Sequence, residues 1–236
     1  MTLSGQKPKV TTNRSMIKKT VNEKGLNYAG ELGMLNAADL SKILKWNVQN
    51  GIKCFRLSSE FFPWASEYNF KDLPQYARIK TLLAGAGNYA KQNGLRLTSH
   101  PGPFNVLVSP REHVVENTIT DLEIHGKVFD MMGLSRTPYN KLNIHCNGVY
   151  GDKLSAMDRF CKNFEKLSPA VQGRLTVEND DKASMYSVKD LMYIHKRIGI
   201  PIVFDYHHHQ FCTGGLTEQE ALELAISTWP KGIKPI

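Results

Sequence analysis

Residues 174–178 have the sequence RLTVE, a short run rich in aliphatic and β-branched side chains that ends in a carboxylate. Four further runs have the same character: residues 52–57 (IKCFRL), 95–100 (LRLTSH), 142–146 (LNIHC) and 201–205 (PIVFD). Runs of this length and composition are typical of buried strands. Amphipathic stretches separate them, and this alternation predicts βα units that build a parallel sheet.

The stretches between the five runs carry apolar side chains at helical spacing. We expect one helix that is capped by Asn36 and stops near Gly51, where a glycine suits a helix end. Further helices are expected at residues 73–93, 110–132, 154–167, 188–198 and 217–228. Residues 59–74 are rich in aromatic side chains but have no clean period, which predicts a long loop.

The composition bounds the kind of protein. A chain of 236 residues with 41% hydrophobic content can bury one substantial core, so we expect a single domain over residues 1–236. The formal net charge of +8 favours polyanionic partners without requiring nucleic acid. Four cysteines without CxxC spacing indicate neither a zinc knuckle nor a disulfide scaffold. We expect a cytoplasmic monomer, or a nuclear one in a eukaryote, that makes no contact with a membrane.

Side chains that bind metals stand at the ends of four of the five runs: His100, His145, Glu178 and Asp205. In a parallel barrel the carboxyl ends of all strands gather on one face, where the active site lies. A lone strand-end histidine is more often an ordinary hydrogen-bonding residue than a ligand, but recurrence in successive strands is hard to attribute to chance. Five parallel strands also suit an open doubly wound sheet, and the strand-end residues favour an α/β barrel of the TIM type.

His208 lies three residues after Asp205 and can reach the same rim. Its neighbours His207 and His209 cannot both point the same way, because side chains alternate sides along an extended segment. Imidazole and carboxylate groups together suit zinc or manganese, and a carboxylate such as Glu178 can bridge two ions. Paired ions activate water for an in-line phosphoryl displacement, so phosphodiester hydrolysis is a natural chemistry for a basic protein.

Two polar loops follow strand ends on the same expected face: HPGPFN (residues 100–105) and NGVYGDK (residues 147–153). Gly102 allows a close backbone approach, and the rings of Phe104 and Tyr150 can stack on a base or simply pack within their loops. The full set of candidate DNA contacts comprises Asn13, Arg14, Arg56, Pro103, Phe104, Asn105, Tyr150 and Lys153.

Six short motifs together resemble one known family, the UV damage endonucleases, in order and spacing. They are TTNR (11–14), FRLSS (55–59), SHPG (99–102), the IH of LNIHC, VEND (177–180) and FDYHHH (204–209). The resemblance implies a TIM-type barrel that binds two to three manganese or zinc ions. It also implies an enzyme that hydrolyses the phosphodiester bond 5′ to UV photoproducts in double-stranded DNA. The implied metal ligands are His100, His145, Glu178, Asp205 and His208, with Glu178 as the bridging carboxylate, and the implied catalytic residues are Glu178, His145 and Lys234.

The sequence departs from this family in two places. Members commonly carry a Gln and a Tyr as a lesion-probing wedge where Pro103 and Phe104 stand here, so lesion preference is open. The first strand and the last strands of the barrel, with their ligands, are expected to be missing. We therefore expect an incomplete barrel with weakened metal binding, in which Lys234 lies near a family lysine that can be modified to coordinate metal.

Two alternatives remain open at this point. A sugar or sugar-phosphate isomerase or epimerase of the xylose isomerase type shares the barrel, the metals and the strand-end histidines. The basic charge favours the nuclease, because a small sugar needs no basic surface. The other alternative is a DNA-binding remnant without a complete metal site.

Overall fold

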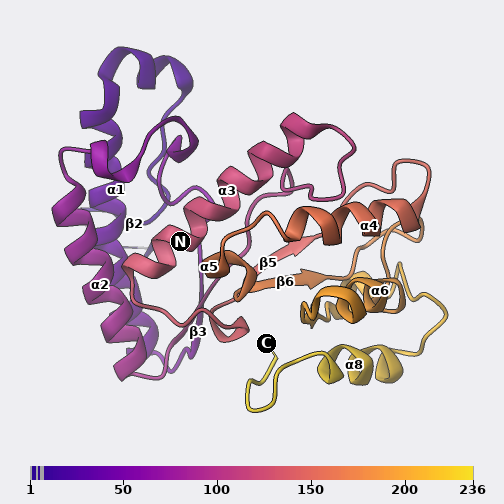
Figure 1. The fold of residues 1–236 in the computed structure, drawn as a ribbon. Coiled ribbons are helices and arrows are strands. Elements are labelled where there is room, and N and C mark those ends of the chain that lie inside the picture. Colours follow the sequence, from indigo (N-terminus) through magenta and orange to yellow (C-terminus); the bar gives the residue numbers. More distant parts are fainter. Residues whose placement is uncertain (1, 4, 6–7, 236) are drawn as a thin grey trace. The chain divides into compact units, whose positions relative to one another are not determined.

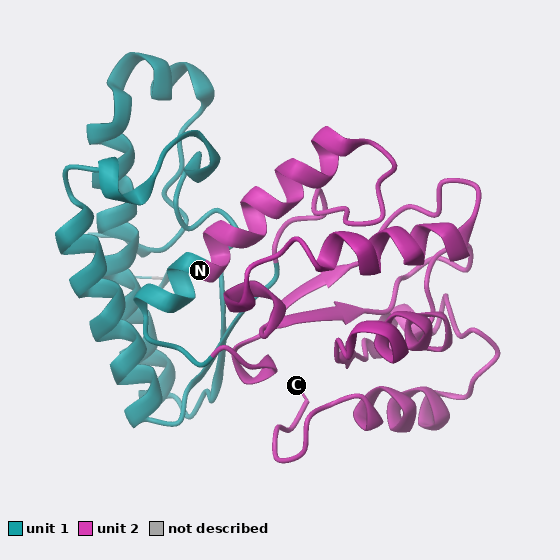
Figure 2. Cartoon of the chain, viewed as in Figure 1, with its two compact units in different colours: residues 1–100, 127–135 teal, residues 101–126, 136–236 magenta. Residues whose placement is uncertain are grey.

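The computed structural model describes residues 2–3, 5 and 8–235. They form two compact units (Figure 2), and the chain passes from one to the other more than once. Unit 1 comprises Met1–His100 and Lys127–Ser135, and unit 2 comprises Pro101–Gly126 and Arg136–Ile236. Helix α3 (Glu112–Met131) runs through the boundary between the two sets of residues.

In unit 1, two helices pack side by side, α1 (Lys18–Gln49) and α2 (Tyr76–Gln92) (Figure 1). The strands β3 (Cys54–Leu57) and β4 (Arg96–Ser99) pair in parallel from Cys54↔Arg96 to Leu57↔Ser99. A short antiparallel pair precedes them, formed by β1 (Thr2–Leu3) and β2 (Val10–Thr11). The apolar face of α2 is buried through Ile79, Leu83 and Ala86, so this helix is held by its amphipathic pattern.

The predicted helix start at Asn36 is wrong. Helix α1 begins at Lys18 and continues past Asn36, with a local break at Gly25, whose φ of 65° places it in the left-handed region. The Asn36 side chain is fully buried within the helix. It donates to the carbonyl oxygens of Arg14 (3.1 Å) and Phe61 (2.9 Å) and accepts from the Arg14 amide (3.1 Å). Asn36 therefore ties two loops to the helix instead of capping it.

The aromatic segment at residues 59–74 is irregular, as predicted, apart from two short 3-10 turns, η1 (Ala65–Glu67) and η2 (Phe70–Asp72). Its rings are largely interior. Phe62 is buried and meets Phe61 and Phe70 edge to face, with ring centroids 5.0 and 4.9 Å apart. This loop thus contributes to the core of unit 1.

Unit 2 contains three parallel strands in the order β5-β6-β7, namely β5 (Leu142–His145), β6 (Leu175–Glu178) and β7 (Ile202–Val203). The register His145↔Glu178 places these two residues side by side. The helices of this unit are α4 (Lys153–Phe164), α5 (Pro169–Gln172), α6 (Val188–Ile198), α7 (Tyr206–His209) and α8 (Glu218–Ser227). A further 3-10 turn, η3 (Pro138–Asn140), leads into β5.

Helix α6 shows how local sequence sets the element bounds. Ser187 and Asp190 form a reciprocal capping box at its start, and Gly199 adopts a φ of 70° at its end, as the start and stop signals require. The five predicted strands are all present, each shorter than its apolar run. Among the described residues, no helix is both long and apolar enough to cross a membrane.

Candidate metal centre

The ends of β6 and β7 bring three of the predicted ligands together. Glu178 is the last residue of β6, Asp205 lies two residues after β7, and His208 lies in the single turn of α7. One ligand atom from each of the three lies within 4.8 Å of the others. The Asp205 carboxylate also caps α7 by accepting the His208 amide at 2.9 Å, which turns the chain back toward the strand ends.

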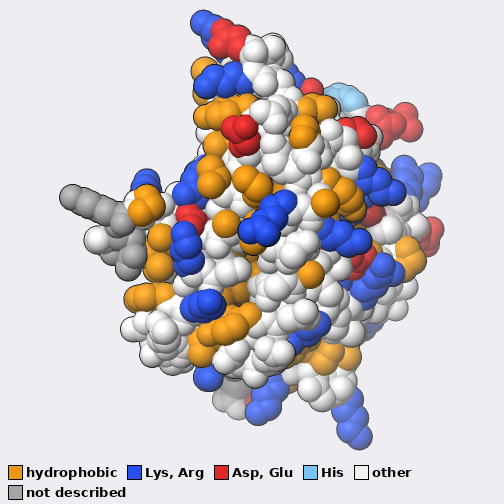
Figure 3. Space-filling view, turned by 90° about the vertical axis from the view of Figure 1, so that its left-hand side faces the viewer, with side chains coloured by type: hydrophobic (Ala, Val, Ile, Leu, Met, Phe, Trp, Pro, Cys, Tyr) orange, Lys and Arg blue, Asp and Glu red, His pale blue; other side chains and the backbone are white. Residues whose placement is uncertain are grey.

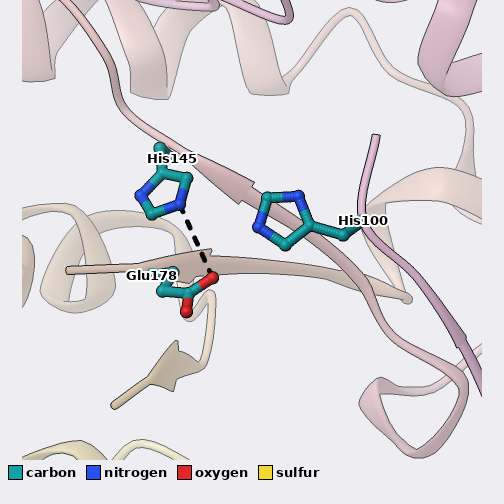
Figure 4. A group of neighbouring side chains, drawn as sticks. All are labelled: His100, His145 and Glu178. Carbon is teal, nitrogen blue, oxygen red and sulfur yellow. Dashed lines mark ion pairs between the residues drawn. The ribbon is translucent and has the colours of Figure 1, made fainter. Parts of the chain in front are cut away.

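His145 joins this group from β5. Its Nε2 lies 3.7 Å from Glu178 Oε2 (Figure 4), and its ring centroid is 5.3 Å from that of His208. Four of the five predicted ligands, two imidazoles and two carboxylates, therefore lie at one edge of the sheet of unit 2. His100, also drawn in Figure 4, directly follows β4 in unit 1, and its role as a ligand stays a prediction.

The orientation of His208 is fixed by the backbone. Its Nδ1 lies 2.9 Å from the carbonyl oxygen of Asn179. A carbonyl oxygen only accepts, so Nδ1 must carry the proton in this contact. Nε2 then keeps its lone pair, which is the arrangement in which histidine binds a metal.

His145 is oriented by a carboxylate instead. Its Nδ1 lies 3.2 Å from Asp180 Oδ1. Burial lowers the pKa of His145, but the contact with the Asp180 carboxylate and the negative charges of Glu178, Asp180 and Asp181 outweigh it, so the pKa lies above its usual value. Asp180 is held in turn by Tyr186, whose carbonyl accepts the Asp180 amide at 2.9 Å. Asp180 and His145 together match the carboxylate–histidine arrangement that supports many protein-bound metal ions.

A buried relay contacts Glu178. The Thr176 hydroxyl donates to Asn143 Oδ1 at 2.8 Å, and Asn143 Nδ2 donates to Glu178 Oε2. Thr176 is fully buried, and Asn143 and Glu178 are nearly so. Because the hydroxyl hydrogen bond occupies the amide oxygen, the amide NH2 must face the carboxylate.

These contacts fit a divalent cation. The donor set combines imidazole nitrogen and carboxylate oxygen, and each ligand is supported by a second residue behind it. Sequence reasoning missed those supporting residues: Asn143, Thr176, Asn179, Asp180 and Tyr186. Asn179 and Asp180 had a visible signal, since both follow directly on a strand end that carries a ligand.

The candidate DNA contacts fall into two groups. Pro103, Phe104, Tyr150, Arg56 and Asn13 are exposed, Phe104 by 88%. Tyr150 also has a φ of 50°, and the guanidinium of Arg159 lies 5.8 Å from its ring centroid.

The other three candidates are engaged within the fold. Asn105 is buried and donates to Gly102 O and Asp121 Oδ2. Arg14 donates to Asp39 at 2.6 Å, and Lys153 donates to Asp190 at 3.1 Å. Lys234, the candidate catalytic lysine, is exposed in the irregular segment after α8. DNA contact by any of the eight residues, and catalysis by Lys234, stay predictions.

Comparison with known proteins identifies the family. The family model described as "UV-endonuclease UvdE" matches residues 1–235. Proteins named UV-damage endonuclease are 38% identical in Neurospora crassa and 37% identical in Schizosaccharomyces pombe, each over 92% of this chain. The match covers 34% and 36% of those two proteins, so the chain spans about a third of their length.

Solved structures agree with this assignment. SacUVDE superposes with a TM-score of 0.84 at 32% identity, over 96% of this chain and 78% of SacUVDE. A D-psicose 3-epimerase from Clostridium cellulolyticum matches with a TM-score of 0.58 at 13% identity, over 81% of this chain and 66% of the epimerase, which shows a shared fold alone. The fold is α/β of the TIM-barrel type. The chain belongs to the UV-endonuclease UvdE family.

Proposed function

We propose that this chain is part of a metal-dependent DNA repair endonuclease that hydrolyses the phosphodiester bond 5′ to UV photoproducts in double-stranded DNA. One observation carries the proposal: ligand atoms of Glu178, Asp205 and His208 lie within 4.8 Å of one another in a chain of the UvdE family. The relatives named UV-damage endonuclease support the substrate class.

The proposed ligands are His145, Glu178, Asp205 and His208 of unit 2, together with His100. These residues would hold manganese or zinc ions, two to three in the complete family site, and Glu178 would be the bridging carboxylate. Bound ions of this kind supply an activated water and stabilise the leaving oxygen of a phosphate.

The chain's own residues orient these groups. Asp180 and the Asn179 carbonyl oxygen hold the Nδ1 atoms of His145 and His208, which leaves Nε2 of each ring for coordination. Asn143 holds one oxygen of Glu178. The proposed catalytic residues are Glu178, His145 and Lys234.

The distribution of charge supports a DNA substrate. The residues of unit 1 include sixteen Lys and Arg against seven Asp and Glu, whereas unit 2 has fourteen against fifteen. Figure 3 faces the side of the molecule that carries α1 and α2, where Lys and Arg are spread among apolar side chains. An excess of this size binds phosphates with counterion release, so the affinity for DNA should fall as salt is added.

The loop after β4 supports a role in probing the lesion. Phe104 exposes 88% of its surface, so its ring is accessible for stacking on a base. Asn105 holds the loop from inside through Gly102 and Asp121. We propose that Phe104 stacks on a base at the damaged site.

The test is a nicking assay on UV-irradiated supercoiled plasmid with added Mn²⁺, Zn²⁺ or EDTA. Undamaged plasmid and plasmid with abasic sites serve as substrate controls. Glu178→Gln should abolish metal-dependent nicking, whereas the matched control Glu165→Gln, on the exposed end of α4, should keep it. An end-labelled duplex with one photoproduct locates the cut. Nicking without a divalent ion, or by Glu178→Gln, would contradict the proposal.

A further inference from the structure

Asn179 continues the pairing of β6 and β7 beyond the point where the strands end. The ladder between them runs through Val177↔Ile202 and Glu178↔Val203. Beyond the last pair of the ladder, the Asn179 side chain forms two hydrogen bonds with the backbone of Asp205. Its Oδ1 accepts the Asp205 amide at 2.8 Å, and its Nδ2 donates to the Asp205 carbonyl at 3.0 Å. The side-chain amide of Asn179 thus bonds both backbone groups of Asp205, the N–H and the C=O.

The same residue also contacts the second ligand on this segment. The Asn179 carbonyl oxygen accepts from His208 Nδ1 at 2.9 Å, and Asn179 directly follows Glu178 in the chain. Its side chain is fully buried. Asn179 is therefore bonded to Asp205 and His208 and covalently joined to the third member of the group.

The contacts of Asn179 with Asp205 and His208, called the Asn179 brace below, matter because the segment that carries these two ligands has little regular structure of its own. Strand β7 has only two residues and α7 only a single turn, and such a short helix is not stable by itself. Without the Asn179 side-chain amide, the Asp205 N–H loses the acceptor Oδ1 and the Asp205 carbonyl keeps the bond from the His209 amide at 3.0 Å. The segment that carries both ligands is then no longer tied to β6 by this side chain and can shift.

We propose that Asn179 is a positioning residue that sets Asp205 and His208 against Glu178 so that the three can share a divalent cation. The proposal rests on the proposed function, because that function supplies the cation. The chemistry requires asparagine: aspartate cannot donate to the Asp205 carbonyl and adds a negative charge, and alanine can neither donate nor accept.

The test compares Asn179→Ala and Asn179→Asp with a matched control, Asn163→Ala, in the full chain. Asn163 is a buried asparagine of the same unit, on α4, and donates to the Leu107 carbonyl at 2.8 Å. Mn²⁺ alone is the probe, and its free concentration is followed by electron paramagnetic resonance. We expect Mn²⁺ affinity to fall by about 10- to 100-fold in both Asn179 variants, as for other residues that support metal ligands. Asn163→Ala should lose stability but keep its affinity.

Amide hydrogen exchange in the metal-free protein provides a second readout. The amides of Asp205 and His208 should exchange faster in Asn179→Ala than in the unaltered chain, and at an unchanged rate in Asn163→Ala. Unchanged Mn²⁺ affinity in the Asn179 variants overturns the positioning role. If the unaltered chain binds no Mn²⁺, the proposed function fails instead, and the exchange rates alone then decide whether the brace exists. If Asn179→Ala does not fold, Asn179→Asp, which is close in size, carries the comparison.

Discussion

Replacing Thr176 with valine tests the buried relay to Glu178. The Thr176 hydroxyl donates to Asn143 Oδ1 at 2.8 Å, and both side chains are buried. Thr176→Val keeps the shape of the side chain but removes the donor, so Asn143 Oδ1 loses this bond in a site that water does not reach. An unsatisfied buried acceptor costs about 1–3 kcal/mol. For a chain of this size that corresponds to a fall in melting temperature of roughly 2–12 °C.

The assay is thermal unfolding followed by circular dichroism in EDTA, together with Mn²⁺ binding. Thr176→Ser is the control: it loses a buried methyl group, about 0.8 kcal/mol, but keeps the hydroxyl. Both variants should melt earlier than the unaltered chain. Mn²⁺ affinity should fall only in Thr176→Val, because only there can the Asn143 amide turn away from Glu178. A valine variant with unchanged melting temperature and unchanged affinity would refute this reasoning.

Three further predictions concern other parts of the chain. Burial raises the pKa of Asp39, but hydrogen bonds from Lys42, Arg14 and the Thr11 amide outweigh it, so the pKa lies below 3.8. A folded pKa below the unfolded one stabilises the fold above pH 3.8 and ceases to do so as the pH falls through the folded value. Asp39→Asn should thus have a free energy of unfolding about 2 kcal/mol lower than the unaltered chain at pH 7. Urea unfolding should show this difference becoming smaller below pH 3.8. A difference that does not change with pH contradicts the lowered pKa of Asp39. Phe104→Ala should weaken binding to irradiated duplex by about 1–3 kcal/mol in a fluorescence anisotropy titration and leave Mn²⁺ affinity unchanged. Equal affinity of the variant and the unaltered chain for the duplex would contradict contact between Phe104 and DNA. The logarithm of the affinity for irradiated duplex should decrease linearly with the logarithm of the salt concentration, and a salt-independent affinity would exclude binding through phosphates.

The sequence predicts the strands and their ends well, because a buried parallel strand is a continuous run of apolar residues. The polar residue at the end of such a run can be recognised from the neighbouring residues alone. Glu178 and Asp205 are predicted in this way and His208 from its position three residues after Asp205, and the structure brings the three together. Helices with a clear apolar face were also placed to within a few residues, as α6 shows.

What could not be predicted depends on partners far away in the sequence. Asn36 is polar and precedes an apolar stripe, which is typical of an N-cap, but it bonds to Arg14 and Phe61, more than twenty positions away. Asn179 acquires its role only from the register of β6 against β7. Burial of such polar groups is compensated by tertiary hydrogen bonds, which a periodicity argument does not contain.

Anomalous X-ray scattering from crystals grown with Zn²⁺ tests the central claim most directly. It should reveal an ion within about 2.0–2.2 Å of an oxygen of Glu178, an oxygen of Asp205 and Nε2 of His208. Ions bound only elsewhere on the chain, with these three side chains directed apart, would contradict it.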